Sequence, residues 1–211
     1  MTIQEIAEEA ALILSKEHPA PKTELIHKNE FELAVSVMLS AQTTDKKVNQ
    51  VTPKLFDRYT SWKDLAEANL LDLQKAIYGV NFHLGKADRL IKAGKFVTSE
   101  YGGVLPHTLE GLVKIPGIAR KSANVILQEL WDIAEGIVVD THVTRVSQRL
   151  GLTTNSDAVK IEQELMKLVP QKYWRNFSGA VVLHGRYVCI ARKPKCEECS
   201  LNKICPSAFK F

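Results

Sequence analysis

The chain has 211 residues, enough for one large domain or two small ones with a hydrophobic core. Apolar residues make up 45% and charged residues 25%, the balance of an ordinary globular protein, and no apolar run approaches the roughly 20 residues of a membrane-spanning helix. The formal net charge of +4 is too small to indicate nucleic-acid binding by itself.

The first fifteen residues have the pattern of an amphipathic helix that carries Glu5, Glu8 and Glu9. They lack the basic start and the small-residue cleavage site of a secretory signal peptide. We therefore expect this segment to belong to the mature fold, and we expect a cytoplasmic protein without a membrane partner.

Helical periodicity recurs along almost the whole chain, with Gly and Pro between the periodic segments. In chain order we expect helices over residues 3–14, 30–39, 48–56, 70–77, 85–100, 119–130, 143–149, 157–168 and 174–190. Residues 136–140 alternate as a strand would, but the run is short enough to be a buried connector. The sequence therefore predicts an all-α fold.

Residues 112–124 (LVKIPGIARKSAN) are typical of a helix, a tight apolar turn and a second helix. Such a turn aims backbone N–H groups at the start of the second helix toward an anion. A Pro-Gly turn before a helix is also common without this function. The full string resembles a helix-hairpin-helix element, whose turn usually has Gly-x-Gly; here Gly117 is kept and Ala119 replaces the second glycine.

Two charged residues follow as catalytic candidates, and each also has an ordinary interpretation. Lys121 lies near the start of the second helix and is either a solvated surface lysine or an amine nucleophile. The helix N-terminus and partial burial would both favour its neutral, nucleophilic form. Asp140 ends the apolar run 137–139, so it is either a helix N-cap or a carboxylate that acts as a base or stabilises a developing cation. The residues alone leave both choices open.

All four cysteines lie near the end of the chain, in a C-x6-C-x2-C-x5-C pattern. Clustered thiols in an intracellular chain point to metal rather than to disulfides, and four thiolates bind either zinc or an iron–sulfur cluster. The single short C-x2-C pair and the compact loop favour a cubane cluster over a zinc clip or unliganded thiols. These cysteines are Cys189, Cys196, Cys199 and Cys205.

The region around the cysteines is basic. From Gln171 onward there are eight Lys or Arg residues and two Glu residues, which gives +6, so the preceding residues sum to −2. Three of the cations, Arg192, Lys193 and Lys195, lie between the first two cysteines. A tight loop there would present them together to phosphate, although a solvated cationic face explains the same pattern.

Four blocks in fixed order resemble the endonuclease III family of the helix-hairpin-helix DNA glycosylases. They are MLSAQTTD at 38–45, the hairpin that leads to Lys121, VDTH at 139–142 and the four-cysteine ending. The resemblance extends from about residue 25 to the last cysteine. It implies two helical lobes with the active site in the cleft between them: residues 22–133 as the helix-hairpin-helix domain, and 1–21 plus 134–211 as the iron–sulfur domain with one [4Fe-4S] cluster.

The resemblance also implies the reaction. Lys121 would attack C1′ of an oxidised pyrimidine nucleotide and form a Schiff base, and β-elimination would then cut the strand 3′ to the lesion. Asp140 would stabilise the cationic sugar. The nucleotide would be flipped out, with Gln42 filling the space it leaves and Phe82 or Leu84 of the loop 81–84 as the intercalating wedge. An alternative for the loop is that these side chains pack in the core.

The partner implied is double-stranded DNA that contains oxidised pyrimidines or abasic sites, bound by a monomer associated with the nucleoid of a bacterium or archaeon. The DNA-contacting residues would be Gln42, Phe82, His83, Leu84, Gly117, Ala119, Arg120, Arg192, Lys193 and Lys195. Further candidates for phosphate contact or the cleft wall, each equally explained as a surface or capping residue, are Lys86, His142, Arg145 and Arg149.

Four other functions are less consistent with the sequence. Adenine glycosylases of this superfamily generally lack the lysine and carry a further domain, and thymine-mismatch glycosylases place another residue at position 121. A DNA-binding module without catalysis would need neither Lys121 nor Asp140 nor Gln42. A small electron carrier would have a compact ferredoxin-like motif rather than 188 helical residues before its first cysteine.

Overall fold

The computed structural model describes all 211 residues and contains helices but no β-strand, so the all-α prediction is confirmed. The helices are α1 (Ile3–Glu17), α2 (Glu30–Ser40), α3 (Asp45–Arg58), α4 (Trp62–Ala66), α5 (Leu70–Ala76), α6 (His83–Tyr101), α7 (Leu109–Val113), α8 (Arg120–Trp131), α9 (Thr141–Arg149), α10 (Ala158–Leu168) and α11 (Trp174–Tyr187), with 3-10 turns η1 (Gln171–Tyr173) and η2 (Cys196–Glu198). None of these helices has the length and apolar character needed to cross a bilayer.

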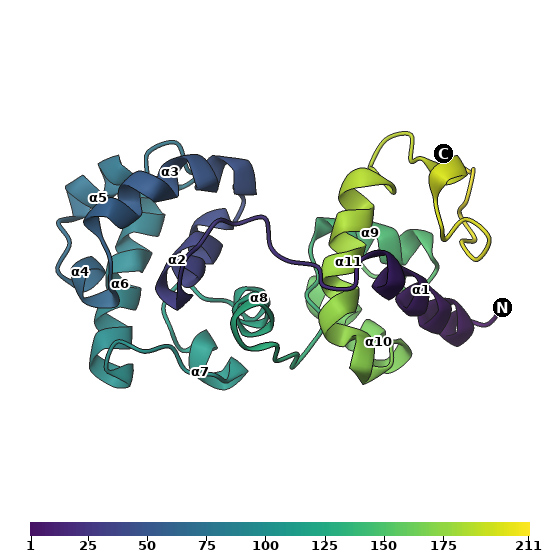
Figure 1. The fold of residues 1–211 in the computed structure, drawn as a ribbon, viewed down its shortest axis with the longest axis horizontal. Coiled ribbons are helices and arrows are strands. Elements are labelled where there is room, and N and C mark those ends of the chain that lie inside the picture. Colours follow the sequence, from purple (N-terminus) through teal and green to yellow (C-terminus); the bar gives the residue numbers. More distant parts are fainter. The chain divides into compact units, whose positions relative to one another are not determined.

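Contacts along the chain divide it into two units. One unit is the continuous segment Thr23–Asp132, and the other combines Met1–Lys22 with Ile133–Phe211. The colouring by sequence in Figure 1 shows the first and last parts of the chain in the same unit.

In the unit Thr23–Asp132, α2 is the central helix. Phe31 and every residue from Leu33 to Leu39 are buried, so α2 is covered on all sides rather than amphipathic. Asn29 caps its start by accepting a hydrogen bond from Glu32 N at 2.9 Å. Helices α3, α6 and α8 pack around it (Figure 1).

The short helix α4 was not predicted, because five residues are too few to show a helical period. Its recognisable sign is the cap: Ser61 Oγ accepts from Asp64 N, and the Asp64 carboxylate accepts from Thr60. α4 lies against α6 at Gly94, where a Cβ atom would be 2.6 Å from both Trp62 O and Ala66 N. The missing side chain of Gly94 therefore allows the two backbones to touch.

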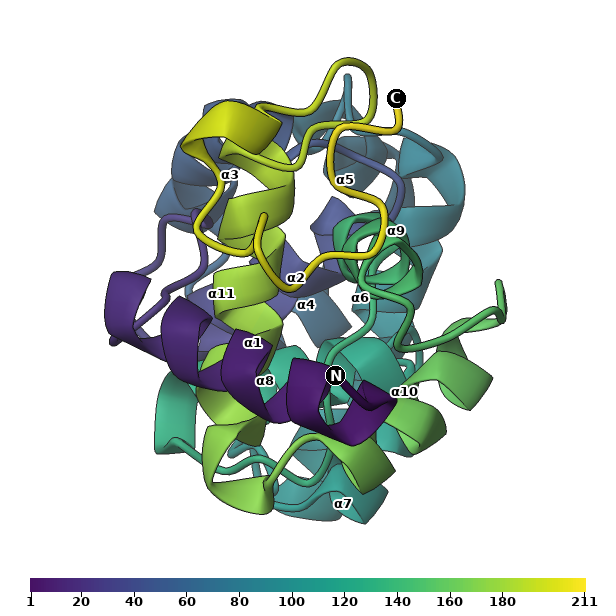
Figure 2. The same cartoon turned by 90° about the vertical axis from the view of Figure 1, so that its right-hand side faces the viewer.

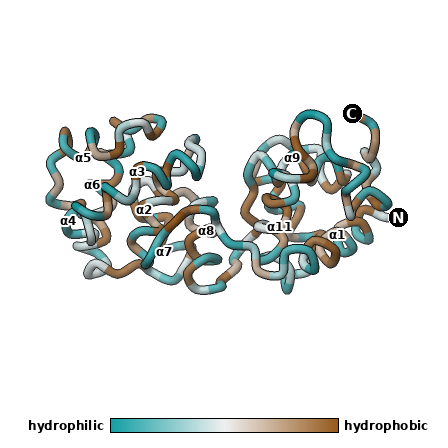
Figure 3. Tube along the Cα trace, turned by 45° about the horizontal axis from the view of Figure 1, so that its top comes forward, coloured by the Kyte–Doolittle hydropathy of each residue, from teal (hydrophilic) through white to brown (hydrophobic).

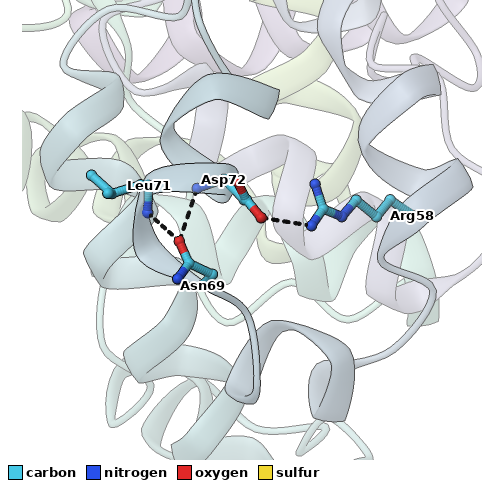
Figure 4. Close-up of polar contacts among 4 residues, drawn as sticks. All are labelled: Arg58, Asn69, Leu71 and Asp72. Carbon is cyan, nitrogen blue, oxygen red and sulfur yellow. Dashed lines mark hydrogen bonds and ion pairs between the residues drawn. The ribbon is translucent and has the colours of Figure 1, made fainter.

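Helix α5 begins at a well-formed cap that Figure 4 shows in detail. Asn69 Oδ1 accepts hydrogen bonds from Leu71 N at 3.0 Å and Asp72 N at 3.2 Å. The Asp72 carboxylate also pairs with Arg58 Nη2 at 2.9 Å, which links the end of α3 to α5. Both side chains are exposed, so solvent screens this pair and it orients the helices more than it stabilises them.

The other unit is held together by a core to which both ends of the chain contribute. Buried Ala and Leu residues of α1 pack with α11, and α9 and α10 complete the same cluster. Figures 1 and 2 show α11 beside both α1 and α9. In Figure 3 hydrophobic and hydrophilic stretches alternate along these helices, as expected for helices with one buried face. The apolar members of this core in α1 are Ala7, Ala10, Ala11 and Leu14.

Two local predictions were tested in this unit. Residues 137–139 are buried and form no strand, as expected of a connector, and Val138 N donates to Ser178 Oγ at 2.9 Å. Helix α11 ends at Tyr187, so the predicted end at residue 190 was wrong. The chain turns there because Cys189 N donates to His184 O at 2.8 Å, and Lys195 N returns to Val188 O at 3.0 Å.

We expect Gly94→Ala to lower the free energy of unfolding by about 1–3 kcal/mol, because the added methyl would overlap the backbone of α4. The matched control is Gly85→Ala in the same helix, where nothing lies within 4 Å of the added Cβ. That change should leave stability unchanged or raise it by up to about 1 kcal/mol through helix propensity. Urea unfolding followed by circular dichroism measures both, and equal midpoints for the two variants would contradict the close contact.

Candidate functional site

The hairpin predicted at residues 112–124 joins α7 to α8 by a short turn. Ile115 and Ile118 are buried at 1% and 3% exposure, and Ile118 N donates to Ile115 O at 3.0 Å, which closes the turn. Gly117 has a φ of +91°, and a Cβ there would lie 2.8 Å from Met38 Cε of α2. Position 117 therefore requires glycine for its backbone conformation, while the flexible Met38 side chain could move aside for a larger residue.

Ala119 is the N-cap of α8 with φ −85° and ψ 166°, an extended conformation open to any residue. The alanine in place of the usual second glycine therefore introduces no backbone strain. No side chain caps α8, and its first turn holds no acidic residue. The positive end of this helix, which begins at Arg120, is thus not neutralised by an acidic residue of its own first turn.

Lys121 is the second residue of α8 and is exposed to solvent. The partial burial expected from the sequence is not found, because the buried face of α8 runs through Ala123, Ile126 and Leu127 instead. The lysine is therefore accessible to a large substrate at the uncapped start of the helix.

Asp140 is the N-cap of α9. Its Oδ1 atom accepts hydrogen bonds from His142 N at 2.8 Å and Val143 N at 2.9 Å, whereas Oδ2 accepts none. The carboxylate is half-buried and follows buried Val139. The capping role is thus real, and it fixes the carboxylate while one oxygen stays available for chemistry.

The loops that carry Gln42 and Phe82 are bonded to each other. Asn81 Nδ2 donates to Gln42 O at 2.5 Å, and Asn81 N donates to Thr43 Oγ1 at 3.2 Å. Gln42 and Phe82 are both exposed and both have a left-handed backbone, with φ of +55° and +57°. Strained, exposed residues of this kind are frequent at functional sites.

The side chains of the loop 81–84 do not pack in the core. Phe82 is 67% exposed and Leu84 is 57% exposed. Leu84 and His83 line a shallow hollow with Leu71 and Tyr78, and the His83 ring meets the Tyr78 ring edge-on at 5.3 Å. The alternative interpretation of this loop as core packing is therefore wrong for Phe82 and Leu84.

Lys86 was a candidate for phosphate contact, but it is buried at 4% exposure in α6. Its Nζ donates to Leu39 O at 2.8 Å, to Ala41 O at 2.6 Å and to Thr43 Oγ1 at 3.1 Å. Burial lowers the pKa of Lys86 to about 8, and the positive charge of Arg89 contributes to the shift. The side chain acts inside the protein, and the sequence pattern of α6 gives no sign of this.

The four cysteines line one pocket, together with apolar groups of Val188, Pro194, Ala208 and Phe211. Burial raises the pKa of the Cys199 thiol to about 11 and also raises that of Cys205, and the neighbouring cysteines add to both effects. Iron binds the thiolate form, so metal binding overcomes this cost of ionisation. Four soft ligands around one apolar pocket fit an iron–sulfur cluster.

Three further candidates from the sequence proved to be structural. Arg149 Nη1 donates to Ile190 O at 2.9 Å and lies 3.2 Å from Cys189 Sγ, and its Nη2 donates to Ala191 O at 3.0 Å. Arg145 donates to Gly185 O at 2.7 Å and to Cys189 O at 3.1 Å, and lies 3.2 Å from His142 Nδ1. These arginines bind backbone carbonyls before and within the basic loop, and both side chains are half-exposed.

The basic loop keeps its three cations exposed. Arg192 and Lys193 are exposed, Lys193 with φ +53°, and Lys195 lies 4.0 Å from Glu198. The structure therefore brings the three cations together on one loop beside the cysteine pocket. Within the unit Thr23–Asp132 it likewise brings Gln42 together with the loop 81–84.

Two family models match the chain. Residues 35–171 match the HhH-GPD superfamily base excision DNA repair protein, and residues 189–205 match the iron-sulfur binding domain of endonuclease III. The second match begins at the first cysteine and ends at the last. The chain accordingly carries a [4Fe-4S] cluster, as expected from the spacing of its thiols.

Similar proteins extend over nearly the full length of the chain. Endonuclease III of Synechocystis sp. is 45% identical over 202 residues, 96% of this chain and 92% of that protein. Endonuclease III of Bacillus subtilis is 41% identical, with 91% and 88% covered. A solved structure of a trapped endonuclease III-DNA covalent intermediate matches with a TM-score of 0.91 at 35% identity, over 100% of this chain and 98% of that one. The chain therefore belongs to the endonuclease III family of the HhH-GPD superfamily of base excision DNA repair proteins.

Proposed function

We propose that this chain excises oxidised pyrimidines from duplex DNA with Lys121 as nucleophile and Asp140 as the assisting carboxylate. Membership of the family makes it a DNA glycosylase with lyase activity that acts in base excision repair and binds DNA. The observation that carries the proposal is the exposed Lys121 at the uncapped start of α8, directly after the hairpin turn. The covalent protein–DNA intermediate trapped in a similar endonuclease III supports covalent catalysis by a nucleophile.

The reaction follows from the chemistry of an amine. The neutral Nζ of Lys121 attacks C1′, and the bond between C1′ and the base breaks with its electron pair leaving on the base, which then takes up a proton. In the resulting amino sugar Nζ loses a proton, and its lone pair expels O4′, which takes up a proton as the sugar ring opens, so that an iminium forms between Lys121 and C1′. This iminium acidifies the proton on C2′. Loss of that proton expels the 3′ phosphate and cuts the strand, so that covalent catalysis divides one difficult cleavage into easier steps.

Asp140 acts through its charge. The sugar carries positive charge while the base departs, and a fixed carboxylate stabilises that charge more effectively than mobile water does. Because the backbone N–H groups of His142 and Val143 hold Oδ1, the side chain is oriented before substrate binds, and Oδ2 stays available for the sugar or for proton transfer.

DNA is held by three groups of contacts in this proposal. The hairpin around Gly117, Ala119 and Arg120 offers the positive end of α8 to a backbone phosphate. Gln42 and the loop 81–84 enter the stack, with Gln42 occupying the space of the flipped nucleotide. The basic loop contacts a second stretch of phosphates through Arg192, Lys193 and Lys195.

The cluster is held by Cys189, Cys196, Cys199 and Cys205, which line a single pocket. When bound, it cross-links a segment that is too short to form a core of its own, so the binding energy becomes folding energy for the basic loop. We further propose that the protein acts as a monomer in the cytoplasm, associated with the nucleoid.

Replacement of Lys121 by Ala should abolish borohydride trapping on a duplex with one thymine glycol, because no Schiff base remains to be reduced. Wild-type protein should give a covalent band. Lys114→Ala is the matched control, since Lys114 is an exposed lysine at the other side of the same hairpin that pairs with Glu110 at 2.8 Å, and it should trap normally. A band that persists in Lys121→Ala would assign the nucleophile to another amine; wild type that binds the duplex without trapping would indicate a DNA-binding module.

Two substitutions at Asp140 separate its capping role from its catalytic role. Asn keeps an oxygen acceptor for the α9 cap but loses the charge, so Asp140→Asn should unfold like wild type and lose activity by a factor of about 100 or more. Asp140→Ala should lose both activity and about 1 kcal/mol of stability. Single-turnover cleavage and denaturant unfolding measure the two effects.

The control for these variants is Asp157, the N-cap of α10, whose Oδ1 accepts from Lys160 N at 2.9 Å. Asp157→Ala should lose about the same stability as Asp140→Ala, since both remove one helix cap, and it should keep full activity. If Asp140→Asn also keeps full activity, then Asp140 is only a cap.

We expect Phe82 rather than Leu84 to be the intercalating wedge. Phe82 is at the left-handed position next to Asn81, whereas Leu84 lies against the hollow lined by Tyr78 and Leu71. Phe82→Ala should therefore reduce single-turnover excision about tenfold or more, since an intercalated wedge offsets the unstacking energy of a few kcal/mol. Leu84→Ala should change it much less. A larger loss in Leu84→Ala would reverse the assignment.

A further inference from the structure

Gln42 occupies a backbone conformation that its residue type does not favour. Thr43 N donates to Ser40 O at 3.0 Å, so residues 40–43 form a tight turn with Gln42 at φ +55° in its third position. Turns of this geometry usually have Gly or Asn at that position, and the left-handed conformation costs other residues about 1–2 kcal/mol. Such strain persists only where surrounding contacts fix the backbone.

Those contacts come from two side chains. Lys86 Nζ binds Ala41 O and Thr43 Oγ1, the groups directly before and after Gln42, and it also binds Leu39 O at the end of α2. Asn81 binds Gln42 O and shares Thr43 Oγ1 with Lys86. Because Lys86 lies in the first turn of α6, whose first two residues are His83 and Leu84, it ties the Gln42 turn and the segment 81–84 to one anchor.

The charge on this anchor is unusual. The three hydrogen-bond partners of the Lys86 ammonium are two carbonyls and a hydroxyl, and no carboxylate pairs with it. A buried ammonium without a counter-ion costs more than an apolar side chain of the same length would. A Met in this place would fill the space but could not bind the turn.

We propose that Lys86 is a positioning residue for nucleotide flipping, holding Gln42 and the loop 81–84 in one preformed arrangement that enters the DNA stack. This inference rests on the proposed function of these two loops. A preformed wedge needs no reorganisation when DNA binds, and displacement of positioning groups by about 1 Å can reduce rates by a factor of about 100. The alternative is that Lys86 serves only to cap the carbonyls at the end of α2 and so only contributes to stability.

The positioning role and the purely structural role predict different cleavage rates on two substrates that differ in base stacking. One substrate is a fully paired duplex with a central abasic site, and the other has the same abasic site inside a short unpaired bubble with identical duplex arms. The bases in the bubble are already unpaired and unstacked before the protein binds, so the wedge is not required there. A loss of folded protein reduces cleavage of both substrates equally, whereas a misplaced wedge reduces cleavage of the paired duplex alone.

The principal variant is Lys86→Met in the full, cluster-loaded protein, with single-turnover strand cleavage and borohydride trapping as readouts. We expect cleavage of the paired duplex to fall by about tenfold to a hundredfold, and cleavage of the bubble to change by less than about twofold. Fluorescence of 2-aminopurine placed beside the abasic site should show reduced unstacking in the paired duplex. Lys95→Met, an exposed lysine of the same helix, is the matched control and should behave as wild type.

Thr43→Val tests the same contact without a change in the buried charge, and it decides the question if Lys86→Met does not fold. It removes the hydroxyl shared by Lys86 and Asn81 on a half-buried loop residue. It should reduce duplex cleavage about tenfold with little effect on the bubble, as loss of two hydrogen bonds would. Equal losses on both substrates, or no loss on either, would overturn the positioning role while the proposed function stands. Wild-type protein that cleaves neither substrate would refute the proposed function, and the inference with it.

Discussion

The buried end of α2 is the constraint on which the functional part of the unit Thr23–Asp132 depends. Met38 meets the glycine of the hairpin at Gly117, so the turn that precedes Lys121 rests directly on α2. One residue later, Leu39 O accepts from Lys86, and the chain then enters the strained turn at Gln42. Because α2 is buried on all sides, it cannot shift without disturbing the core. One rigid helix, α2, therefore fixes the relative positions of the hairpin, the Gln42 turn and the segment 81–84.

Helix α9 has the corresponding role in the other unit. Its first turn is fixed by Asp140, and its last turn carries Arg149, which binds the carbonyls of Ile190 and Ala191 and approaches Cys189 Sγ. The cysteine pocket and the Asp140 carboxylate are thus at opposite ends of one nine-residue helix packed on α11. Metal binding by the cysteines at one end would therefore stabilise the same helix that Asp140 caps at the other.

The sequence predicted the features that local pattern and chemistry determine, and it did not predict the features that long-range contacts determine. Hydrophobic period predicted the long helices, and composition predicted the buried connector at 137–139. The spacing of the cysteines predicted that the metal ligands lie together. Helix α4 was missed because its five residues show no helical period, and its position depends on contact with Gly94 of α6, twenty-eight residues after the end of α4. The burial of Lys86 is likewise a tertiary property, since lysine is almost never fully buried and its partners lie more than forty residues earlier.

Several places where the sequence breaks local rules coincide with the proposed DNA contacts. Gln42 and Phe82 take left-handed conformations that glycine would adopt without strain, and Lys86 is a buried charge that an apolar residue would replace at lower cost. Each feature alone is unfavourable for folding, yet they are joined by the hydrogen bonds of Asn81 and Lys86 into one cluster. Glycine at position 42 or 82 would relieve the strain but would remove the side chain that is proposed to enter DNA. The strain is therefore the consequence of placing a side chain at the tip of a turn, and the buried ammonium is what keeps that turn in place.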